Sequence, residues 1–402
     1  MTTVSRAAKF AERTAHLRAS TIREMLKVTQ QPDVISFGGG LPAPELFPTD
    51  QIADAAKRVM ERRGAAALQY SVTEGIPEMR RWVAERLTRQ NGRIVEAEDV
   101  TIVNGSQQGL DLVAKILLDP GDHVVLENPS YLGAIQAFDA YQARYLTADT
   151  DDDGMIPESL ERVLERADPF PKFVYLVPNF QNPTGRTLSR DRRERIVRIC
   201  EHFDVPVFED DPYGELRFEG ENLPTLFSHD SRGPIVYLGT GSKIMAPGMR
   251  VAWLVTRDEE IREKVVLAKQ GADLHSGTFA QYVFHEYVSD GNAFETHVRR
   301  IAETYARRRN VMAQALDRLT AEGLHYSRPQ GGMFLWATLP GVDTHELLQR
   351  SAEQKVVFVP GVSFYPARDV HDGMRLNFSN ASEEMIRLGI ERLGHAINTL
   401  SR

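Results

Sequence analysis

Cysteine is almost absent from this chain, which carries only Cys200 among its 402 residues. A single cysteine excludes an internal disulfide and a cysteine-rich metal site. It falls in a stretch with helical periodicity, 192–202, so we interpret it as a small core residue rather than a nucleophile. Lysine is also scarce, because nine of the 48 basic residues are lysines. Few side chains are therefore candidates for covalent chemistry at an amine.

Long apolar runs and basic blocks are lacking as well. The longest apolar runs are far too short to span a membrane. The net charge is −8 and no basic block occurs, so nothing points to nucleic acid. Neither a His-rich pair spacing nor a Gly-x4-Gly-Lys-Ser/Thr loop is present, and we expect no metal site and no P-loop. Apolar residues at 42% and charged residues at 26% are ordinary for a soluble protein, which we expect to be cytoplasmic.

The first 19 residues are basic, with a single acid, Glu12. Such a segment loosely suits an organellar transit peptide, but the apolar core of a secretory signal is missing. We interpret residues 1–19 as an N-terminal arm. A helix capped by Ser20 or Thr21 is predicted to follow it.

From residue 100 the chain alternates between short apolar runs and amphipathic stretches. This alternation predicts an α/β fold with a mostly parallel seven-stranded sheet that helices cover on both faces. The predicted strands are 100–103, 123–126, 143–146, 173–177, 205–208, 235–238 and 251–255. The predicted helices are 49–63, 76–89, 106–118, 132–141, 157–166 and 190–203.

The pattern changes after about residue 291. A long helix over 294–319 precedes predicted strands at 333–337, 356–359 and 375–378, and a helix over 383–400 ends the chain. This part predicts a smaller α+β domain. We expect a large domain over 49–291 and a small domain made of 20–48 and 292–402, with a substrate-gating helix at its N-terminal end.

The stretch from Gly239 to Arg250 carries the most distinctive chemistry. Lys243 lies among small and hydroxylic residues, and a confined lysine loses its proton more easily and can form a Schiff base with a carbonyl. Thr240, Ser242 and Arg250 suit a phosphate group. Together they are typical of a pyridoxal phosphate (PLP) site. A solvated surface turn would fit the same residues, so this stretch alone does not decide.

Polar motifs follow the predicted strands at the point where each ends. Ligands of parallel sheets bind beyond these carboxyl ends. The motif 104–108 opens a predicted helix, whose N-terminus attracts a phosphate group. The motif 128–131 ends in Tyr131, whose aromatic face can stack on a planar ring. Another glycine-rich loop, 36–44, lets backbone approach a ligand closely. The strand-end motifs are 104–108, 128–131, 179–185, 209–213 and the segment around Lys243.

At this point the chain resembles a fold-type I PLP-dependent aminotransferase, and within that class the 2-aminoadipate and kynurenine aminotransferase II-like group. The resemblance runs from about Ser20 to the C-terminus. One departure is Thr240-Gly241-Ser242, where relatives often show Ser-x-Ser, but Thr240 keeps the hydroxyl. The motifs that carry the resemblance are 20–24 (STIRE), 39–48 (GGLPAPELFP), 105–108 (GSQQ), 181–185 (QNPTG), 209–213 (EDDPY), 270–275 (QGADLH) and 329–334 (PQGGMF).

The resemblance implies a role for each matching residue. Lys243 would carry the Schiff base and move the proton, and Asp210 would keep the pyridinium nitrogen protonated. Asn182 and Tyr213 would hydrogen-bond the 3′-oxygen of PLP. The remaining cofactor contacts would come from Tyr131 on the ring, from Ser106, Gln107, Thr240, Ser242 and Arg250 on the phosphate, and from Tyr70 of the neighbouring subunit.

The resemblance also implies how substrate is held. Arg375 would clamp the α-carboxylate, while Asn182 and Gly40 would line the same site. Arg23, on the predicted first helix, would meet a distal carboxylate or move aside for apolar side chains. A solvated helix arginine is the plainer interpretation of Arg23, and the Gly-rich loop beside it favours the gating one.

We therefore expect transamination of an L-amino acid, such as 2-aminoadipate or an aromatic or branched-chain one, with 2-oxoglutarate as acceptor. The expected enzyme is a homodimer with shared active sites. Another PLP reaction, such as β-elimination or decarboxylation, is the alternative on the same fold. A PLP-binding transcription regulator is a further alternative, which we do not favour because an added DNA-binding domain has no room before Ser20.

Overall fold

The computed structural model describes residues 10–11, 13–14, 33–233 and 235–400. The predicted N-terminal helix that begins near Ser20, with Arg23 on it, lies outside these residues. Within the described part of the chain, no helix has the length and apolar character needed to cross a membrane.

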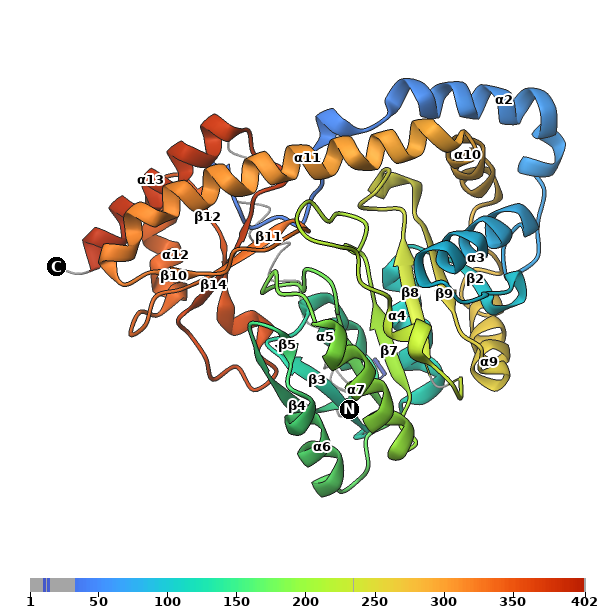
Figure 1. Cartoon of the computed structure of the whole chain (residues 1–402), viewed down its shortest axis with the longest axis horizontal. Helices are drawn as coiled ribbons and strands as arrows, with labels where there is room; N and C mark the ends of the chain where they lie inside the picture. Colours follow the sequence, from blue (N-terminus) through green and yellow to red (C-terminus); the bar gives the residue numbers. More distant parts are fainter. Residues whose placement is uncertain (1–9, 12, 15–32, 234, 401–402) are drawn as a thin grey trace, which may run out of the picture.

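A large twisted sheet forms the centre of the molecule (Figure 1). Its order is β2-β9-β8-β7-β6-β3-β4-β5. The parallel pairs include β7 with β8, β6 with β7 and β3 with β6, whereas β9 runs antiparallel to both of its neighbours. The strands are β2 (Val100–Asn104), β3 (His123–Asn128), β4 (Arg144–Asp151), β5 (Gly154–Met155), β6 (Phe173–Leu176), β7 (Val207–Asp210), β8 (Ile235–Thr240) and β9 (Val251–Val255).

All seven predicted strands are present, and the sheet has an eighth, β5, that the sequence did not predict. Gly154 has φ +90°, which a residue with a side chain rarely adopts, and the chain folds back there on β4. The return pairs Thr150 with Met155 over two residues only. So short an element leaves no periodic pattern in the sequence.

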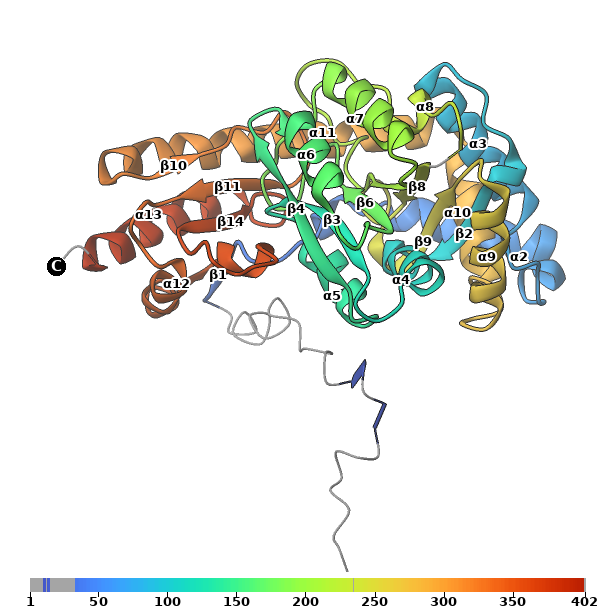
Figure 2. The same cartoon turned by 90° about the horizontal axis from the view of Figure 1, so that it is seen from below.

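Helices cover both faces of this sheet, and Figure 2 shows α6 and α7 on one face and α4 and α5 on the other. The central strands β6, β7 and β8 are buried along their whole length, as strands covered on two sides must be. The helices of this part are α2 (Thr49–Ala67), α3 (Pro77–Asn91), α4 (Ser106–Leu117), α5 (Leu132–Asp139), α6 (Pro157–Arg166), α7 (Arg190–His202), α8 (Leu226–His229), α9 (Glu259–Gln270) and α10 (Thr278–Val288).

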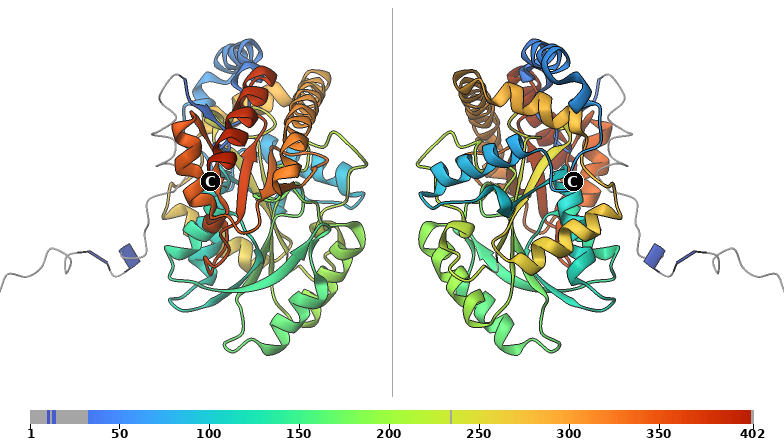
Figure 3. Two further views of the ribbon diagram at one scale, coloured as in Figure 1. Left: turned by 90° about the vertical axis from the view of Figure 1, so that its left-hand side faces the viewer. Right: turned by 90° about the vertical axis from the view of Figure 1, so that its right-hand side faces the viewer.

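A second, antiparallel sheet of order β10-β11-β14-β13 lies toward the C-terminus of the chain. Its strands are β10 (His325–Tyr326), β11 (Phe334–Thr338), β13 (Val359–Pro360) and β14 (Gly373–Asn377). The helices α11 (Gly291–Leu316) and α13 (Glu383–Leu400) run side by side next to it, with α12 (Thr344–Glu353) nearby (Figures 1 and 3). Short 3-10 helices occur at Pro44–Leu46, Ala97–Asp99, Pro247–Met249, Asp317–Glu322 and Gly361–Phe364.

The predicted strand 356–359 is split in two because it changes partners. Its first half, β12 (Val356–Val357), pairs in parallel with β1 (Ile35–Ser36), and its second half, β13, pairs with β14. The segment that begins at residue 33 therefore packs with the C-terminal part of the chain. This pairing supports the proposed small domain of 20–48 and 292–402, whose limits stay a proposal.

Candidate active site

A cavity of about 290 Å³ opens at the carboxyl ends of the strands of the large sheet. Five connections reach it, those after β2, β3, β6, β7 and β8. Most of the predicted site residues meet here although they are far apart in the sequence. The lining residues are Gly40, Ser106, Gln107, Tyr131, Val177, Asn182, Asp210, Pro212, Tyr213, Thr240, Ser242, Lys243, Pro247, Arg250, Phe334 and Arg375.

Lys243 projects into this cavity just beyond β8. Its Nζ donates a hydrogen bond to the Gly40 carbonyl oxygen at 2.9 Å, and no carboxylate within the described residues forms an ion pair with it. Burial lowers the pKa of Lys243 to about 8, and the positive charges of Arg375 and Arg250 act in the same direction. A much larger share of this side chain than of an ordinary lysine is therefore a free amine, and hence a nucleophile and a base, near neutral pH.

Asp210 ends β7 and is 2% exposed. Its Oδ2 accepts a hydrogen bond from the Tyr175 hydroxyl at 2.8 Å, while its buried Oδ1 has no partner among the described residues. Burial raises the pKa of Asp210 to about 7, and the Tyr175 hydrogen bond works against that rise. A buried oxygen without a partner is costly, so it is placed for a donor that the protein itself does not supply.

The neighbouring carboxylate, Asp211, is held within the protein instead. Its Oδ1 accepts from Asn179 Nδ2 and from the Gly214 amide, each at 3.0 Å, and its Oδ2 accepts from the Tyr237 hydroxyl at 3.3 Å. Asp211 is absent from the cavity lining. The alternation of side chains along the chain thus separates two adjacent acids into one that faces the cavity and one that is already satisfied.

Arg375, on β14, is a cation buried to 1% exposure. Its Nη1 donates to Asn182 Oδ1 at 2.8 Å and its Nη2 to the Gly38 carbonyl at 2.6 Å. The guanidinium lies 4.3 Å from the centre of the Phe334 ring. Burial lowers the pKa of Arg375 to about 10, and its Nε has no partner among the described residues. A buried guanidinium that makes no ion pair there is suited to bind an anion from outside.

Tyr213 and Asn182 close the wall between Asp210 and Arg375. Asn182 Nδ2 donates to the Tyr213 hydroxyl oxygen at 3.3 Å. Burial raises the pKa of the Tyr213 hydroxyl. The half-buried Tyr131 lines the same cavity and its ring packs over Gly133, where a Cβ would come within 2.5 Å of it. The wall thus offers amide and phenol groups together with an aromatic face.

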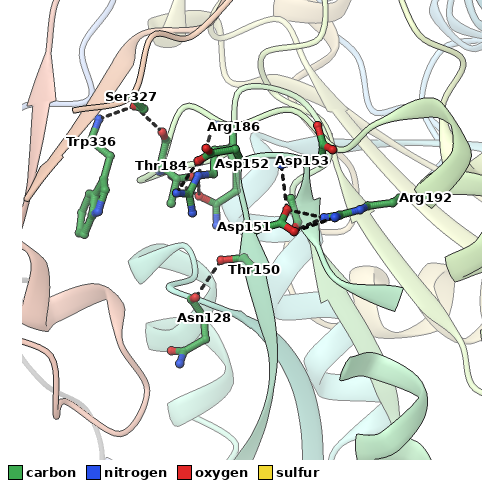
Figure 4. Close-up of polar contacts among 12 residues, drawn as sticks. Asn128, Thr150, Asp151, Asp152, Asp153, Thr184, Arg186, Arg192, Ser327 and Trp336 are labelled. Atoms are coloured by element: carbon green, nitrogen blue, oxygen red, sulfur yellow. Dashed lines mark hydrogen bonds and ion pairs between the residues drawn. The ribbon is translucent and has the colours of Figure 1, made fainter. Parts of the chain in front are cut away.

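The connection that carries Asn182 is fixed by both sheets. Gln181 Oε1 accepts from the Thr184 amide and hydroxyl, and the Ser327 hydroxyl donates to the Thr184 carbonyl at 2.9 Å. The Trp336 amide of β11 in turn donates to Ser327 Oγ at 3.0 Å, as Figure 4 shows. Asn182 therefore has a defined position relative to Arg375 on the neighbouring strand of the small sheet.

Hydroxyl and cationic groups gather at the other end of the cavity. Thr240 and Ser242 have their hydroxyl oxygens 3.1 Å apart, and Ser106 begins α4 without a side-chain cap. Gly105 before it has φ +75°, and a Cβ there would meet the Arg250 guanidinium at 2.1 Å. Free amide groups at a helix N-terminus, hydroxyls and an arginine together form a binding site for a phosphate group.

The model of the class I and II aminotransferase family matches residues 32–393. This chain belongs to that family. It is 42% identical to aromatic-amino-acid aminotransferase 1 of Thermococcus litoralis, over 96% of this chain and 94% of the relative. It is also 42% identical to the 2-aminoadipate transaminase of Thermus thermophilus, over 97% of each chain.

Solved structures agree with the family. The aminotransferase superposes on the α-aminoadipate aminotransferase of Thermus thermophilus, complexed with N-(5′-phosphopyridoxyl)-L-leucine, with a TM-score of 0.91, 41% identity and 99% of each chain covered. The kynurenine aminotransferase of Pyrococcus horikoshii, in complex with PMP, gives a TM-score of 0.94, 40% identity and the same coverage. The fold-type I architecture, the enzyme class and the PLP cofactor expected from the sequence are confirmed.

The cavity of this aminotransferase fits PLP on its own residues. Hydroxyl groups, a helix N-terminus and Arg250 suit its phosphate, Asp210 Oδ1 has no partner among the described residues, and Lys243 lines the same cavity. Two predicted residues are not in the lining. Tyr70 is 78% exposed and its ring lies edge-on to His275 at 5.7 Å, and Arg23 lies outside the described residues.

Phe334 and Tyr175 are the contacts that the sequence did not single out. Phe334 belongs to a motif of the resemblance, but inside a strand it looked like one more core residue. Tyr175 lies in the buried strand β6, and a buried tyrosine hydroxyl needs a partner. That rule could have predicted from the sequence that Tyr175 has a hydrogen-bond partner, although it could not identify Asp210 as that partner.

Proposed function

We propose that this PLP-dependent aminotransferase uses the residues of the cavity in the roles that their chemistry suits. The observation that carries the proposal is one cavity that holds a lysine with a lowered pKa, a buried guanidinium and a carboxylate oxygen without a partner among the described residues. When bound, PLP supplies the aldehyde that takes up an amino group and the ring that accepts electrons from the substrate Cα.

Lys243 is the proposed catalytic base and acid. Its Nζ takes the proton from the substrate Cα and would deliver it to C4′ of the cofactor, so that the proton moves between these two carbons within one half-reaction. A pKa of about 8 suits both directions of this transfer near neutral pH.

The proposed binding roles follow from charge. Arg375 binds the substrate α-carboxylate, and the guanidinium fork favours a bidentate pair. Asp210 holds its negative charge opposite the ring nitrogen, and Asn182 and Tyr213 orient the 3′-oxygen of the ring. The proposed phosphate ligands are Ser106, Gln107, Thr240, Ser242 and Arg250, with Tyr131 on the ring face and Gly40 beside the substrate.

The proposed amino donors are 2-aminoadipate and aromatic or branched-chain amino acids, with 2-oxoglutarate as acceptor. The names of the relatives support this class, since they act on aromatic amino acids and on 2-aminoadipate. Among the described residues, three cations line the cavity, Lys243, Arg250 and Arg375, and each already has a proposed role. Arg23 is therefore the proposed partner of a distal carboxylate.

The proposed enzyme is a homodimer in which Tyr70 reaches the phosphate of the partner site. An exposed tyrosine among exposed apolar residues such as Leu68 and Val72 supports a covered face. A mixed dimer of Lys243→Ala and Tyr70→Ala chains should recover one intact site, whereas each variant alone should have none. We also propose the cytoplasm as its compartment, which the single buried Cys200 suits.

Borohydride reduction and peptide mapping test the central assignment. The adduct with PLP should lie on Lys243, and Lys243→Ala should bind PLP without the lysine-linked chromophore or turnover. An adduct on another lysine would refute the assignment. The products of the unreduced wild-type enzyme test the alternative reaction. Release of pyruvate and ammonia instead of a donor-derived 2-oxo acid would identify β-elimination.

A further inference from the structure

The two oxygens of the Asp210 carboxylate have different surroundings. Oδ2 accepts the Tyr175 hydroxyl at 2.8 Å. Oδ1 is buried without a partner among the described residues, in a side chain that lines the cavity. One oxygen is thus anchored in the protein and the other is left for a ligand.

Tyr175 is held firmly enough to act as that anchor. It is 0% exposed on β6, and its ring lies edge-on to Phe138 at 5.6 Å and to Phe208 at 5.8 Å. Tyr175 pairs with Phe208 in the parallel register, so Asp210 lies two residues farther along β7 on the same face. The tyrosine hydroxyl therefore reaches the carboxylate diagonally across two adjacent strands.

We propose that Tyr175 is a positioning residue for transamination, whose hydroxyl anchors Oδ2 of Asp210 so that Oδ1 faces the ring nitrogen of PLP and the carboxylate keeps its negative charge. This inference rests on the proposed role of Asp210. It adds a residue that is absent from the cavity lining and would act on the cofactor only through that carboxylate.

The electrostatics of the strand end explain why such an anchor is needed. Burial raises the pKa of Asp210 to about 7, and the nearby Asp211 adds to the rise. The Tyr175 hydrogen bond opposes both effects because it stabilises the charged form. Without that donor, the pKa of Asp210 would rise further, and the charged carboxylate opposite the ring nitrogen would be less stable.

The chain contains a matched control. β7 lies between β6 and β8, and each of these strands gives a buried tyrosine to one acid at the end of β7. Tyr175 donates to Asp210, whereas Tyr237 donates to Asp211 at 3.3 Å. Tyr175→Phe and Tyr237→Phe remove the same hydroxyl from equivalent surroundings, but only the first touches the acid in the cavity.

The test uses holoenzyme reconstituted with PLP that carries ¹⁵N at the ring nitrogen. At pH 7.5 the ¹⁵N chemical shift of the wild type should report a pyridinium. Tyr175→Phe should move the shift toward neutral pyridine and weaken PLP binding by about tenfold, while Tyr237→Phe should leave both unchanged. A wild-type shift in Tyr175→Phe, or an equal change in Tyr237→Phe, would overturn the proposal.

Asp210→Asn separates this inference from the function beneath it. If Asp210→Asn keeps the pyridinium shift, the assigned role of Asp210 is wrong. If it loses that shift while Tyr175→Phe keeps it, only the role of Tyr175 fails.

A second measurement tests the proposal without PLP, in case Tyr175→Phe binds PLP too weakly for the ¹⁵N experiment. In apo-protein with ¹³C-labelled aspartate carboxyls, the signal missing from Asp210→Asn identifies Asp210. This signal should titrate at a higher pH in Tyr175→Phe than in wild type. An unchanged midpoint would refute the proposed anchor.

Discussion

Covalent capture of PLP by the apo-protein should follow a pH profile that bends near 8 if Lys243 is the nucleophile, as proposed. Its pKa is lowered from 10.5 to about 8. At pH 7 this leaves roughly 9% of the side chain as free amine, against roughly 0.03% for an unshifted lysine, a difference of about 300-fold. The capture rate should rise about tenfold per pH unit below 7 and level off above about 8.5.

Substitutions of Arg375 test what lowers the pKa of Lys243. After burial, the Arg375 guanidinium is the first of the charges that lower the pKa of Lys243. Arg375→Gln removes that charge and should move the bend to higher pH, while Arg375→Lys keeps a cation and should leave it near 8. Both variants lose the guanidinium fork, so the pair isolates charge from shape.

Stopped-flow absorbance after mixing apo-protein with PLP gives the rate at each pH, and borohydride trapping with peptide mapping confirms the lysine. The protonation of PLP itself is the same in every mixture, so it cancels from the comparison of variants. A rate that keeps rising tenfold per unit beyond pH 9 would show that Lys243 has an ordinary pKa. An equal shift in both Arg375 variants would show that charge is not the cause.

Three further predictions address single residues. Asp210→Asn should still bind PLP but lose turnover, because a hydrogen bond to a charged group contributes about 1.5–3 kcal/mol. Asp211→Asn should keep far more activity, and the reverse order would mean that Asp211 is the acid that pairs with the cofactor. Glu127 is 3% exposed and burial raises its pKa to about 8, so the stability that its protonated form contributes is complete below about pH 4.5 and is lost as the pH rises through 8. Urea unfolding of the apo-protein should therefore give a free energy of unfolding that falls with pH between pH 6 and 8, and falls less steeply in Glu127→Gln than in wild type, by roughly 1.4 kcal/mol per pH unit. Equal slopes in the two proteins would contradict this prediction. Arg23→Ala should raise KM for 2-aminoadipate, glutamate and 2-oxoglutarate about tenfold to a hundredfold, with little change for leucine in single turnover, and an equal loss for leucine would make Arg23 structural.

The sequence predicted which residues meet in the cavity because each of them lies directly after its own predicted strand. A buried strand, a polar motif directly after it and the rule that carboxyl ends share one edge were enough to bring Ser106, Asn182, Asp210 and Lys243 together. None of these steps requires knowledge of strand order. The same holds for the seven strands of the large sheet, each long enough to leave its own pattern.

What the sequence could not predict depends on register between distant segments. The bond from Tyr175 to Asp210 exists because β6 and β7 pair with Tyr175 opposite Phe208. The split of 356–359 exists because β1 takes only the first half of that run. Such pairings are decided by tertiary packing, and a single sequence carries no periodic signal for them.

Three of the charged side chains in the cavity would destabilise a protein that binds no ligand there. Lys243, Asp210 and Arg375 lie in or against buried surroundings, and each has its pKa shifted toward the neutral form. Their own contacts do not neutralise them, since Lys243 and Arg375 bind carbonyl oxygens and Asp210 binds a phenol. In the proposed roles, the aldehyde and ring nitrogen of PLP would satisfy Lys243 and Asp210, and the α-carboxylate of the amino-acid substrate would satisfy Arg375. The charges that are unfavourable in the protein alone therefore favour a cofactor and a substrate that carry these groups between them.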